Sequence, residues 1–277
     1  TALSIDGCLA SFAPFDKRIH DVRKQNGQQV IAKKLFDLLK DSDIAKSHLD
    51  NDIRVQDPYS FRAAPQILGS CFDQFQFSKK IIEDELNSVT DNPLVFSNDK
   101  EILSGANFHG MPLSIVADTL KLILAHIAGV SERRIFWALS GHDKYNKLPP
   151  FLTKDPGLQS GLMITQYAAA SCVTELRQLA SPASVGNIST CAGIEDYNSQ
   201  GATASLQLRD SIKLATYVIS IELMVMSQAL EFHRPLKSTK YIENLYENIR
   251  KLCPPFTADR SPSKDIELIA QKIKEGL

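Results

Sequence analysis

Apolar side chains recur every three or four residues along most of the chain, which is the spacing of one face of an α-helix. The first long stripe consists of Leu68, Phe72, Phe75, Ile82, Leu86 and Val89, and it stops at the turn residues Asp91-Asn92-Pro93. A second stripe predicts a helix over about 113–135, with further apolar residues on its other faces. Because it is apolar all round, we expect this helix to be buried among others.

Two more long helices are predicted in the second half of the chain. The segment of about 159–180 carries small side chains at 168–172, which let helices approach closely, and it ends at Ser181-Pro182. The segment of about 204–232 keeps its apolar residues in register over more than about five turns. Shorter helices are expected at about 28–40, 242–252 and 263–274, and a single hairpin at 94–96 and 102–103.

These elements predict an all-α fold, a bundle of long helices in one domain over 1–277, since no composition shift marks a boundary. The formal net charge of −1 argues against a nucleic-acid partner. The most apolar stretch, 214–230, is interrupted by Glu222, so we expect a buried helix and not a membrane span. Five widely spaced cysteines without a CxxC motif favour reduced thiols in the cytoplasm.

Common catalytic signatures are absent from the sequence. The histidines and cysteines lack metal-ligand spacing, so no metal is expected. No phosphate-binding GxxxxGK[ST] motif and no GxSxG nucleophile motif occurs.

The segment 54–66 is the most informative part of the chain. It places Gln56, Tyr59 and Arg62 just ahead of a long helical stripe. If a helix begins near Pro58, Tyr59 and Arg62 project from one face, because residues three apart are neighbours on a helix. A phenol and a guanidinium that can bind a carboxylate would then share one wall of a pocket.

Five ordered segments together resemble the histidine and aromatic amino-acid ammonia-lyases over nearly the whole chain. They are Pro14-Phe15-Asp16-Lys17-Arg18-Ile19-His20, the segment 54–66, Asn87-Ser88-Val89-Thr90-Asp91-Asn92-Pro93-Leu94, Ser104-Gly105-Ala106-Asn107-Phe108-His109-Gly110 and Leu148-Pro149-Pro150-Phe151-Leu152. The resemblance implies an L-aspartase-like helical fold, a homotetramer, and active sites that draw loops from more than one subunit.

The family's electrophile is a 4-methylidene-imidazol-5-one (MIO) ring made from an Ala-Ser-Gly tripeptide, and this chain contains no such tripeptide. We therefore expect the chain to be the C-terminal portion of a lyase, inactive without the missing N-terminal half. The complete enzyme would eliminate ammonia from L-histidine to give trans-urocanate.

The resemblance also implies roles for five residues. Arg62 would bind the substrate carboxylate, while Tyr59 and Gln56 would line the MIO ring. Phe108 would pack beside the electrophile and the substrate ring. Glu195 matches the carboxylate that holds the imidazole in histidine-specific members.

Two alternatives to the histidine reaction stay open. Gly193-Ile194 replaces the Asn-Gln pair of the family, so the enzyme could instead be a phenylalanine or tyrosine ammonia-lyase or an aminomutase. The altered pair and the absent tripeptide also permit a non-catalytic helical assembly module or degenerate paralogue.

Overall fold

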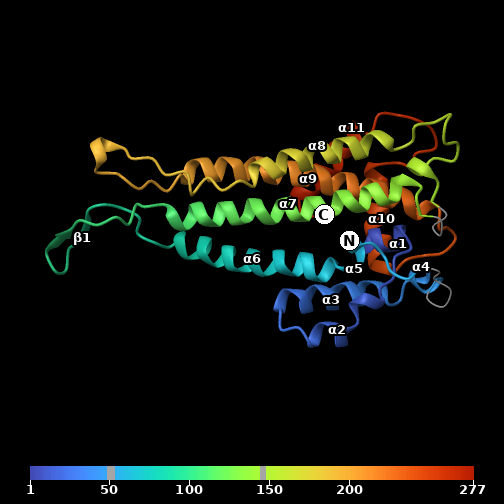
Figure 1. Cartoon of the computed structure of the whole chain (residues 1–277), viewed down its shortest axis with the longest axis horizontal. Coiled ribbons are helices and arrows are strands. Elements are labelled where there is room, and N and C mark those ends of the chain that lie inside the picture. The colour runs from blue at the N-terminus through green and yellow to red at the C-terminus, as the bar shows by residue number, and fades with distance from the viewer. Residues whose placement is uncertain (49–53, 144–147) are drawn as a thin grey trace.

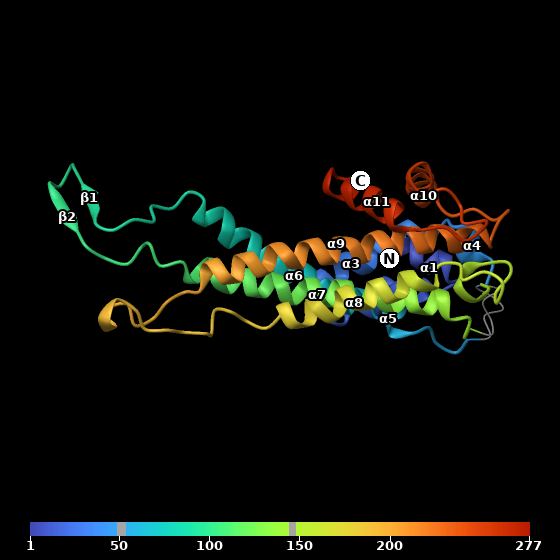
Figure 2. The same cartoon turned by 90° about the horizontal axis from the view of Figure 1, so that it is seen from above.

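Four long helices lie lengthwise beside one another in the computed structural model, which describes residues 1–48, 54–143 and 148–277 (Figures 1 and 2). They are α6 (Ala64–Glu85), α7 (Met111–Ser140), α8 (Met163–Leu179) and α9 (Gly201–Glu231). The other elements are α1 (Ala2–Gly7), η1 (Ala13–Phe15), α2 (Lys17–Asp21), α3 (Asn26–Leu39), α4 (Asp43–Lys46), α5 (Tyr59–Arg62), β1 (Leu94–Phe96), β2 (Glu101–Leu103), η2 (Pro150–Leu152), η3 (Cys191–Gly193), α10 (Lys240–Leu252) and α11 (Ser263–Lys274).

The helices α7 and α9 form the centre of the bundle. They pack along each other, α8 lies against both, α6 packs on α7, and α3 covers α6. At one end, the short helices α1, α4 and α10 close the core. At the other end, the antiparallel β1–β2 hairpin and the loop 181–200 project beyond the long helices (Figure 1). The prediction of an all-α bundle is confirmed.

Both central helices are long and apolar enough, by length and composition, to cross a membrane. In each of them about half of the most apolar stretch, 44% in α7 and 61% in α9, is buried inside the structure. The expectation that α7 would be buried all round is wrong for part of its surface, because Ile115 and Leu122 are each about half exposed.

The predicted helices are found, with differences of a few residues at several of their ends. The stripe from Leu68 was expected to continue to Val89, but α6 ends at Glu85. There the side chains of Asn87 and Ser88 donate hydrogen bonds to the carbonyls of Glu83 and Asp84, which satisfies the last turn. α8 begins four residues later than predicted, after Gly161 with its positive φ of 53°, and α7 continues to Ser140, five residues beyond its predicted end.

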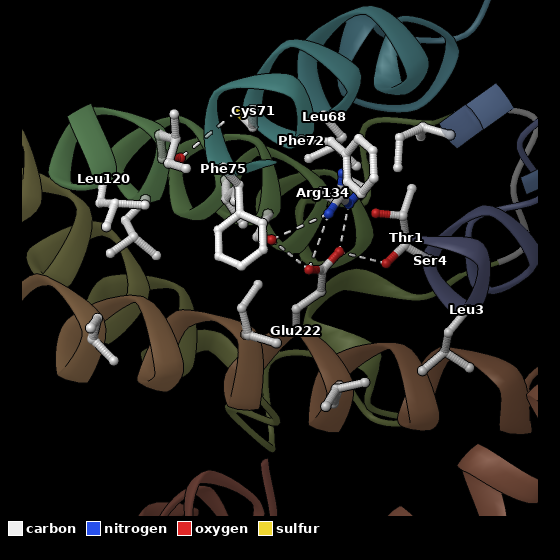
Figure 3. Close-up of a pocket in the computed structure, with 18 of the residues that line it drawn as sticks. Thr1, Leu3, Ser4, Leu68, Cys71, Phe72, Phe75, Leu120, Arg134 and Glu222 are labelled. Atoms are coloured by element: carbon white, nitrogen blue, oxygen red, sulfur yellow. Dashed lines mark hydrogen bonds and ion pairs between the residues drawn. The ribbon is translucent and has the colours of Figure 1, made fainter. Parts of the chain in front are cut away.

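A buried ion pair joins the two central helices. Arg134 of α7 donates from Nε to Oε1 of Glu222 on α9 at 2.5 Å and from Nη2 to Oε2 at 3.1 Å. Ser4 and Ser131 also donate to the carboxylate at 2.6 Å. Burial alone would raise the pKa of Glu222, but the charge of Arg134 and the hydrogen bonds from Arg134 and Ser131 act together against burial, and the pKa is lowered to about 2. Glu222, which interrupts the apolar stretch 214–230 in the sequence, is thus a buried carboxylate paired with Arg134 (Figure 3).

Truncation of the core should be costly. Leu230 of α9 is fully buried, whereas Leu206 of the same helix is 53% exposed. We expect Leu230→Ala to lower the free energy of unfolding by about 2–5 kcal/mol, because the lost methyl groups leave a cavity. Leu206→Ala should cost less than about 0.5 kcal/mol. Urea unfolding of both variants tests this, and equal losses would contradict the described packing.

Stability should also depend on the protonation of Asp6. Burial raises the pKa of this α1 carboxyl to about 6. Hydrogen bonds from Ser238 and Ser42 lower the pKa and so act against burial. The nearby carboxylate of Glu243, which is paired with Arg234, raises it further. In the unfolded chain the Asp6 carboxyl has its ordinary pKa of 3.8, so between about pH 4 and 6 only the folded state keeps this carboxyl protonated.

The contribution of Asp6 to the free energy of unfolding should therefore grow as pH falls from 7 to 4, by about 2–3 kcal/mol. Urea unfolding at pH 7, 6, 5 and 4 measures it, and Asp6→Asn should remove this part of the pH dependence. An identical pH profile in the variant would assign the effect to another group.

Candidate functional site

Three of the predicted site residues form one cluster at the start of α5. Pro58 precedes the helix, and Tyr59 and Arg62 project from the same face, as expected. The guanidinium of Arg62 lies 4.5 Å from the centroid of the Tyr59 ring. Arg62 also donates from Nη2 to Oε1 of Gln56 at 2.8 Å. Tyr59 is 69% exposed, and its hydroxyl contacts no hydrogen-bond partner among the described residues.

The backbone beneath this cluster is held by buried charges. Arg62 donates from Nε to the carbonyl of Asp57 at 2.9 Å. The carboxylate of Asp57 accepts from the amide of Ser11 at 2.8 Å and pairs with Arg54 at 3.2 Å. Arg54 also pairs with Asp143 at 3.2 Å. The side chains of Arg54, Asp57 and Asp143 are each less than 10% exposed. These buried ion pairs therefore hold the segment that carries Gln56 and Arg62 in place.

Two hollows open on either side of Arg62. One, of about 510 Å³, reaches Pro14 and Ile19, which belong to the first of the five family-like segments. The other, of about 480 Å³, is lined by Tyr59 and by Trp137 of α7. Gln56 and Arg62 contribute to both hollows. The cluster therefore presents an amide and a guanidinium to open space of the size that a small amino acid needs.

Arg62 keeps one edge available for a ligand. Its Nε and one Nη2 hydrogen are used by Asp57 and Gln56. The outer edge, formed by Nη1 and the second Nη2 hydrogen, has no hydrogen bond to a described residue. Two parallel N–H donors in one plane match the two oxygens of a carboxylate.

Phe108 lies elsewhere, in the loop between β2 and α7. Its ring is 56% exposed. The next residue, His109, donates from Nε2 to the carbonyl of Tyr197 at 2.8 Å. This bond ties the loop before α7 to the loop before α9.

Glu195 stands in that second loop, at the far tip of the bundle. Thr190 donates from its amide to the carbonyl of Glu195 at 2.8 Å and from its hydroxyl to the carboxylate at 2.9 Å. Between them, Cys191, Ala192 and Gly193 have positive φ angles. Gly193 has a φ of 92°, a conformation that an asparagine side chain would strain. The glycine of the altered pair thus fits the turn that presents Glu195.

The five predicted residues therefore fall into two groups far apart within one chain. Arg134 donates from Nη1 to the carbonyl of Ser60 at 3.2 Å, which places α5 against the late part of α7. Phe108 lies just before Met111, where α7 begins. At 1.5 Å per residue, the two ends of this stretch of α7 are about 35 Å apart. The structure does not bring Gln56, Tyr59 and Arg62 together with Phe108 and Glu195.

Sequence reasoning missed the ionic support of the cluster. Asp57 lies inside the segment that we singled out, and its type and position could have suggested a backbone anchor. Its partner Ser11 is 46 residues away, and no local pattern identifies it. Over residues 1–48, 54–143 and 148–277, no group of three or more histidine, cysteine or acidic side chains could hold a metal ion.

Comparisons with known proteins identify the family to which the chain is similar. The family model for aromatic amino acid lyases matches residues 1–251. The chain is 42% identical to the histidine ammonia-lyase of Myxococcus xanthus over 275 residues, which are 99% of this chain and 54% of that enzyme. It is 41% identical to the histidine ammonia-lyase of Legionella pneumophila strain Paris, covering 98% of this chain and 53% of that one. The chain thus spans about half the length of the curated relatives it matches.

Solved structures resemble the fold closely. Histidine ammonia-lyase from Trypanosoma cruzi superposes with a TM-score of 0.90 at 34% identity, over 99% of this chain and 51% of that chain. Phenylalanine aminomutase from Pantoea agglomerans superposes with a TM-score of 0.91 at 32% identity, over 98% and 56%. Since the family model covers most of the residues, the chain belongs to the aromatic amino acid lyase family.

Proposed function

We propose that this chain is part of a histidine ammonia-lyase, an enzyme that eliminates ammonia from L-histidine to give trans-urocanate in the cytoplasm. The observation that carries the proposal is the cluster of Gln56, Tyr59 and Arg62 in a chain 42% identical to a histidine ammonia-lyase. Buried ion pairs hold the cluster in place, and it is open to solvent on its other side. The part of the relatives that this chain does not match would correspond to the N-terminal half of the enzyme.

Each residue would act on a different part of the substrate. The outer edge of Arg62 would bind the α-carboxylate through two hydrogen bonds and so fix the amino acid. Phe108 would pack against the substrate ring. The Glu195 carboxylate, held by Thr190, would accept a hydrogen bond from the imidazole N–H. An amino acid without that N–H would leave the glutamate unpaired, which favours histidine.

The residues of the cluster fit as neighbours of the MIO ring, although no tripeptide in this chain could form it. The exposed phenol of Tyr59 and the amide of Gln56 face the same open hollow. In the complete enzyme the ring would supply the electrophile that makes the substrate amine a better leaving group. This chain's own contribution would be positioning and electrostatic stabilisation.

The two groups of residues would meet only between copies of the chain. Their separation of about 35 Å along α7 is several times the length of histidine. We therefore propose that the Phe108–Glu195 end of one subunit completes the Gln56–Tyr59–Arg62 cluster of another, in a homotetramer. Such an arrangement would make assembly a condition for activity.

A different substrate is the second candidate. Ile194 is 84% exposed and apolar at a position where the family carries the polar residue of its Asn-Gln pair, so the side-chain hydrogen bonds that select the substrate ring would differ here. Tyrosine and phenylalanine aminomutases are among the similar structures. Analysis of products from histidine, phenylalanine and tyrosine separates these reactions. No product with any of them, from an assembled protein, would favour a non-catalytic helical module.

The first experiment is release of ammonia and urocanate from L-histidine by this chain co-expressed with the polypeptide encoded immediately upstream. The chain alone is the control. We expect activity only in the combination, since the electrophile must come from the other polypeptide.

Replacement of Arg62 should weaken substrate binding in the complete enzyme. Arg62→Lys keeps the charge but loses the two-pronged contact, at a cost of about 1.5–3 kcal/mol. We expect kcat/KM for histidine to fall about 10- to 100-fold with a raised KM. Arg23→Lys, at an exposed position, is the control. Unchanged steady-state kinetics would remove Arg62 from the site.

Neutralising Glu195 should reduce histidine turnover. Glu195→Gln removes a charge-assisted hydrogen bond, so kcat/KM should drop by about one to several powers of ten. The neighbouring Asp196→Asn provides a matched control, because Asp196 is an exposed carboxylate in the same loop. Equal effects of the two substitutions on urocanate formation would exclude the imidazole role of Glu195.

A further inference from the structure

Asn198 lies in the same loop as Glu195, three residues after it, and its side-chain amide contacts that loop at three points. Its Nδ2 donates to the carbonyl of Ile188 at 2.6 Å, to the carbonyl of Glu195 at 3.2 Å and to the hydroxyl of Thr190 at 3.3 Å. Carbonyl oxygens only accept hydrogen bonds, so the nitrogen of this amide, and not its oxygen, must face the turn. Asn198 is therefore a donor to three groups of the turn that presents Glu195.

The two ends of the loop are held from outside it. Near its start, the carboxylate of Asp118 on α7 accepts hydrogen bonds from the amides of Ala183 at 3.1 Å and Ser184 at 2.8 Å. Near its end, the carbonyl of Tyr197 accepts the hydrogen bond from His109. Because the ends are fixed, the hydrogen bonds inside the loop determine the shape of the turn between them.

These contacts determine the direction in which the Thr190 hydroxyl donates. A hydroxyl has one hydrogen, and Asn198 occupies one of the lone pairs of this oxygen. Two acceptors lie near the hydrogen, Oε2 of Glu195 at 2.9 Å and the carbonyl of Glu195 at 3.4 Å. The carbonyl already accepts from the Thr190 amide and from Asn198. The hydroxyl therefore donates to the carboxylate, the shorter and charge-assisted of the two bonds.

The result is a chain of hydrogen bonds from Asn198 through Thr190 to Oε2 of Glu195, which we call the Asn198 brace. The other carboxylate oxygen, Oε1, has no hydrogen bond to a residue that the structure describes. Gly193 and Ile194, just before Glu195, have no polar side-chain atom that could orient it. The brace thus holds one oxygen of the carboxylate and leaves the other for a ligand.

We propose that Asn198 is a positioning residue for the histidine reaction, because the brace holds the Glu195 carboxylate with Oε1 available to the substrate. This role rests on the proposed function, in which Glu195 accepts a hydrogen bond from the imidazole N–H. Asn198 acts through Thr190 and does not touch the substrate. A carboxylate that is oriented before binding loses less rotational freedom when the imidazole arrives, so the brace strengthens recognition of histidine.

The kinetic test uses Asn198→Leu, which keeps a side chain of similar size but removes its donors. The variant chain is co-expressed with the polypeptide encoded immediately upstream. We expect kcat/KM for L-histidine to fall about tenfold, mainly through a raised KM, because the contact with the imidazole loses its fixed geometry. Ser189→Leu is the matched control, at an exposed position of the same loop, and it should leave kcat/KM unchanged.

A double-substitution cycle separates positioning from general structural damage. In the Glu195→Ala background, Asn198→Leu should change kcat/KM by less than about twofold, because the carboxylate on which it acts is gone. Thr190→Val should show the same dependence on Glu195, whereas Thr190→Ser keeps the hydroxyl and should retain wild-type kinetics. Equal losses from Asn198→Leu in both backgrounds would overturn the proposal.

Hydrogen exchange in this chain alone gives a readout that does not require catalysis. The amide of Thr190 donates to the carbonyl of Glu195 at 2.8 Å, and the amide of Glu195 donates to the carbonyl of Thr190 at 3.3 Å. We expect both amides to exchange about tenfold faster in Asn198→Leu, because the turn opens more readily without the brace. Exchange in Ser189→Leu should equal that of the wild type. Unchanged exchange in Asn198→Leu would overturn the proposal even if activity fell.

The two readouts distinguish the brace from the enzymatic function. Faster exchange in Asn198→Leu, together with a wild-type assembly that forms no urocanate, would support the brace and contradict the lyase function. Urocanate formation that is insensitive to Asn198→Leu would support the function and contradict the positioning role.

Discussion

The buried pair of Arg134 and Glu222 is the interaction on which the arrangement of this protein depends. It joins α7 to α9, and its hydrogen bonds reach Ser4 in α1 and the carbonyl of Ser60 in α5. Two charges removed from water cost several kcal/mol each unless every donor and acceptor is paired. Here the carboxylate has four hydrogen bonds, from Arg134 twice and from two serines. The geometry of four helices is thus specified at one point, because any displacement would leave a buried charge unpaired.

Local patterns predicted most of the helices but few of the contacts between them. The long helices and the β1–β2 hairpin follow from periodicity and turn residues, which act over a few positions. The end of α6 was misplaced, because side chains of Asn87 and Ser88 satisfied the last turn where the apolar stripe still continued. Arg134 and Glu222 are 88 residues apart, and only the folded chain reveals that they meet.

The candidate site likewise has one part that local sequence predicted and one part that it did not. Gln56, Tyr59 and Arg62 were expected together because they lie within seven residues around a predicted helix start, and the structure places them in contact. The sequence alone could not place Phe108 and Glu195 relative to that cluster. Their distance from it is set by the length of α7, a property of the whole bundle. The hydrogen bond between His109 and Tyr197, which joins residues 88 positions apart, had no local signal either.

These features together suggest how a lyase could link catalysis to assembly. A rigid helix of 30 residues keeps the two groups of site residues apart in each chain, so no single chain can form the complete site by bending. The cluster near α5 is supported by Arg134, which donates a hydrogen bond to the carbonyl of Ser60. In the proposed homotetramer, a second subunit would bring Phe108 and Glu195 to the substrate that Arg62 of the first subunit holds.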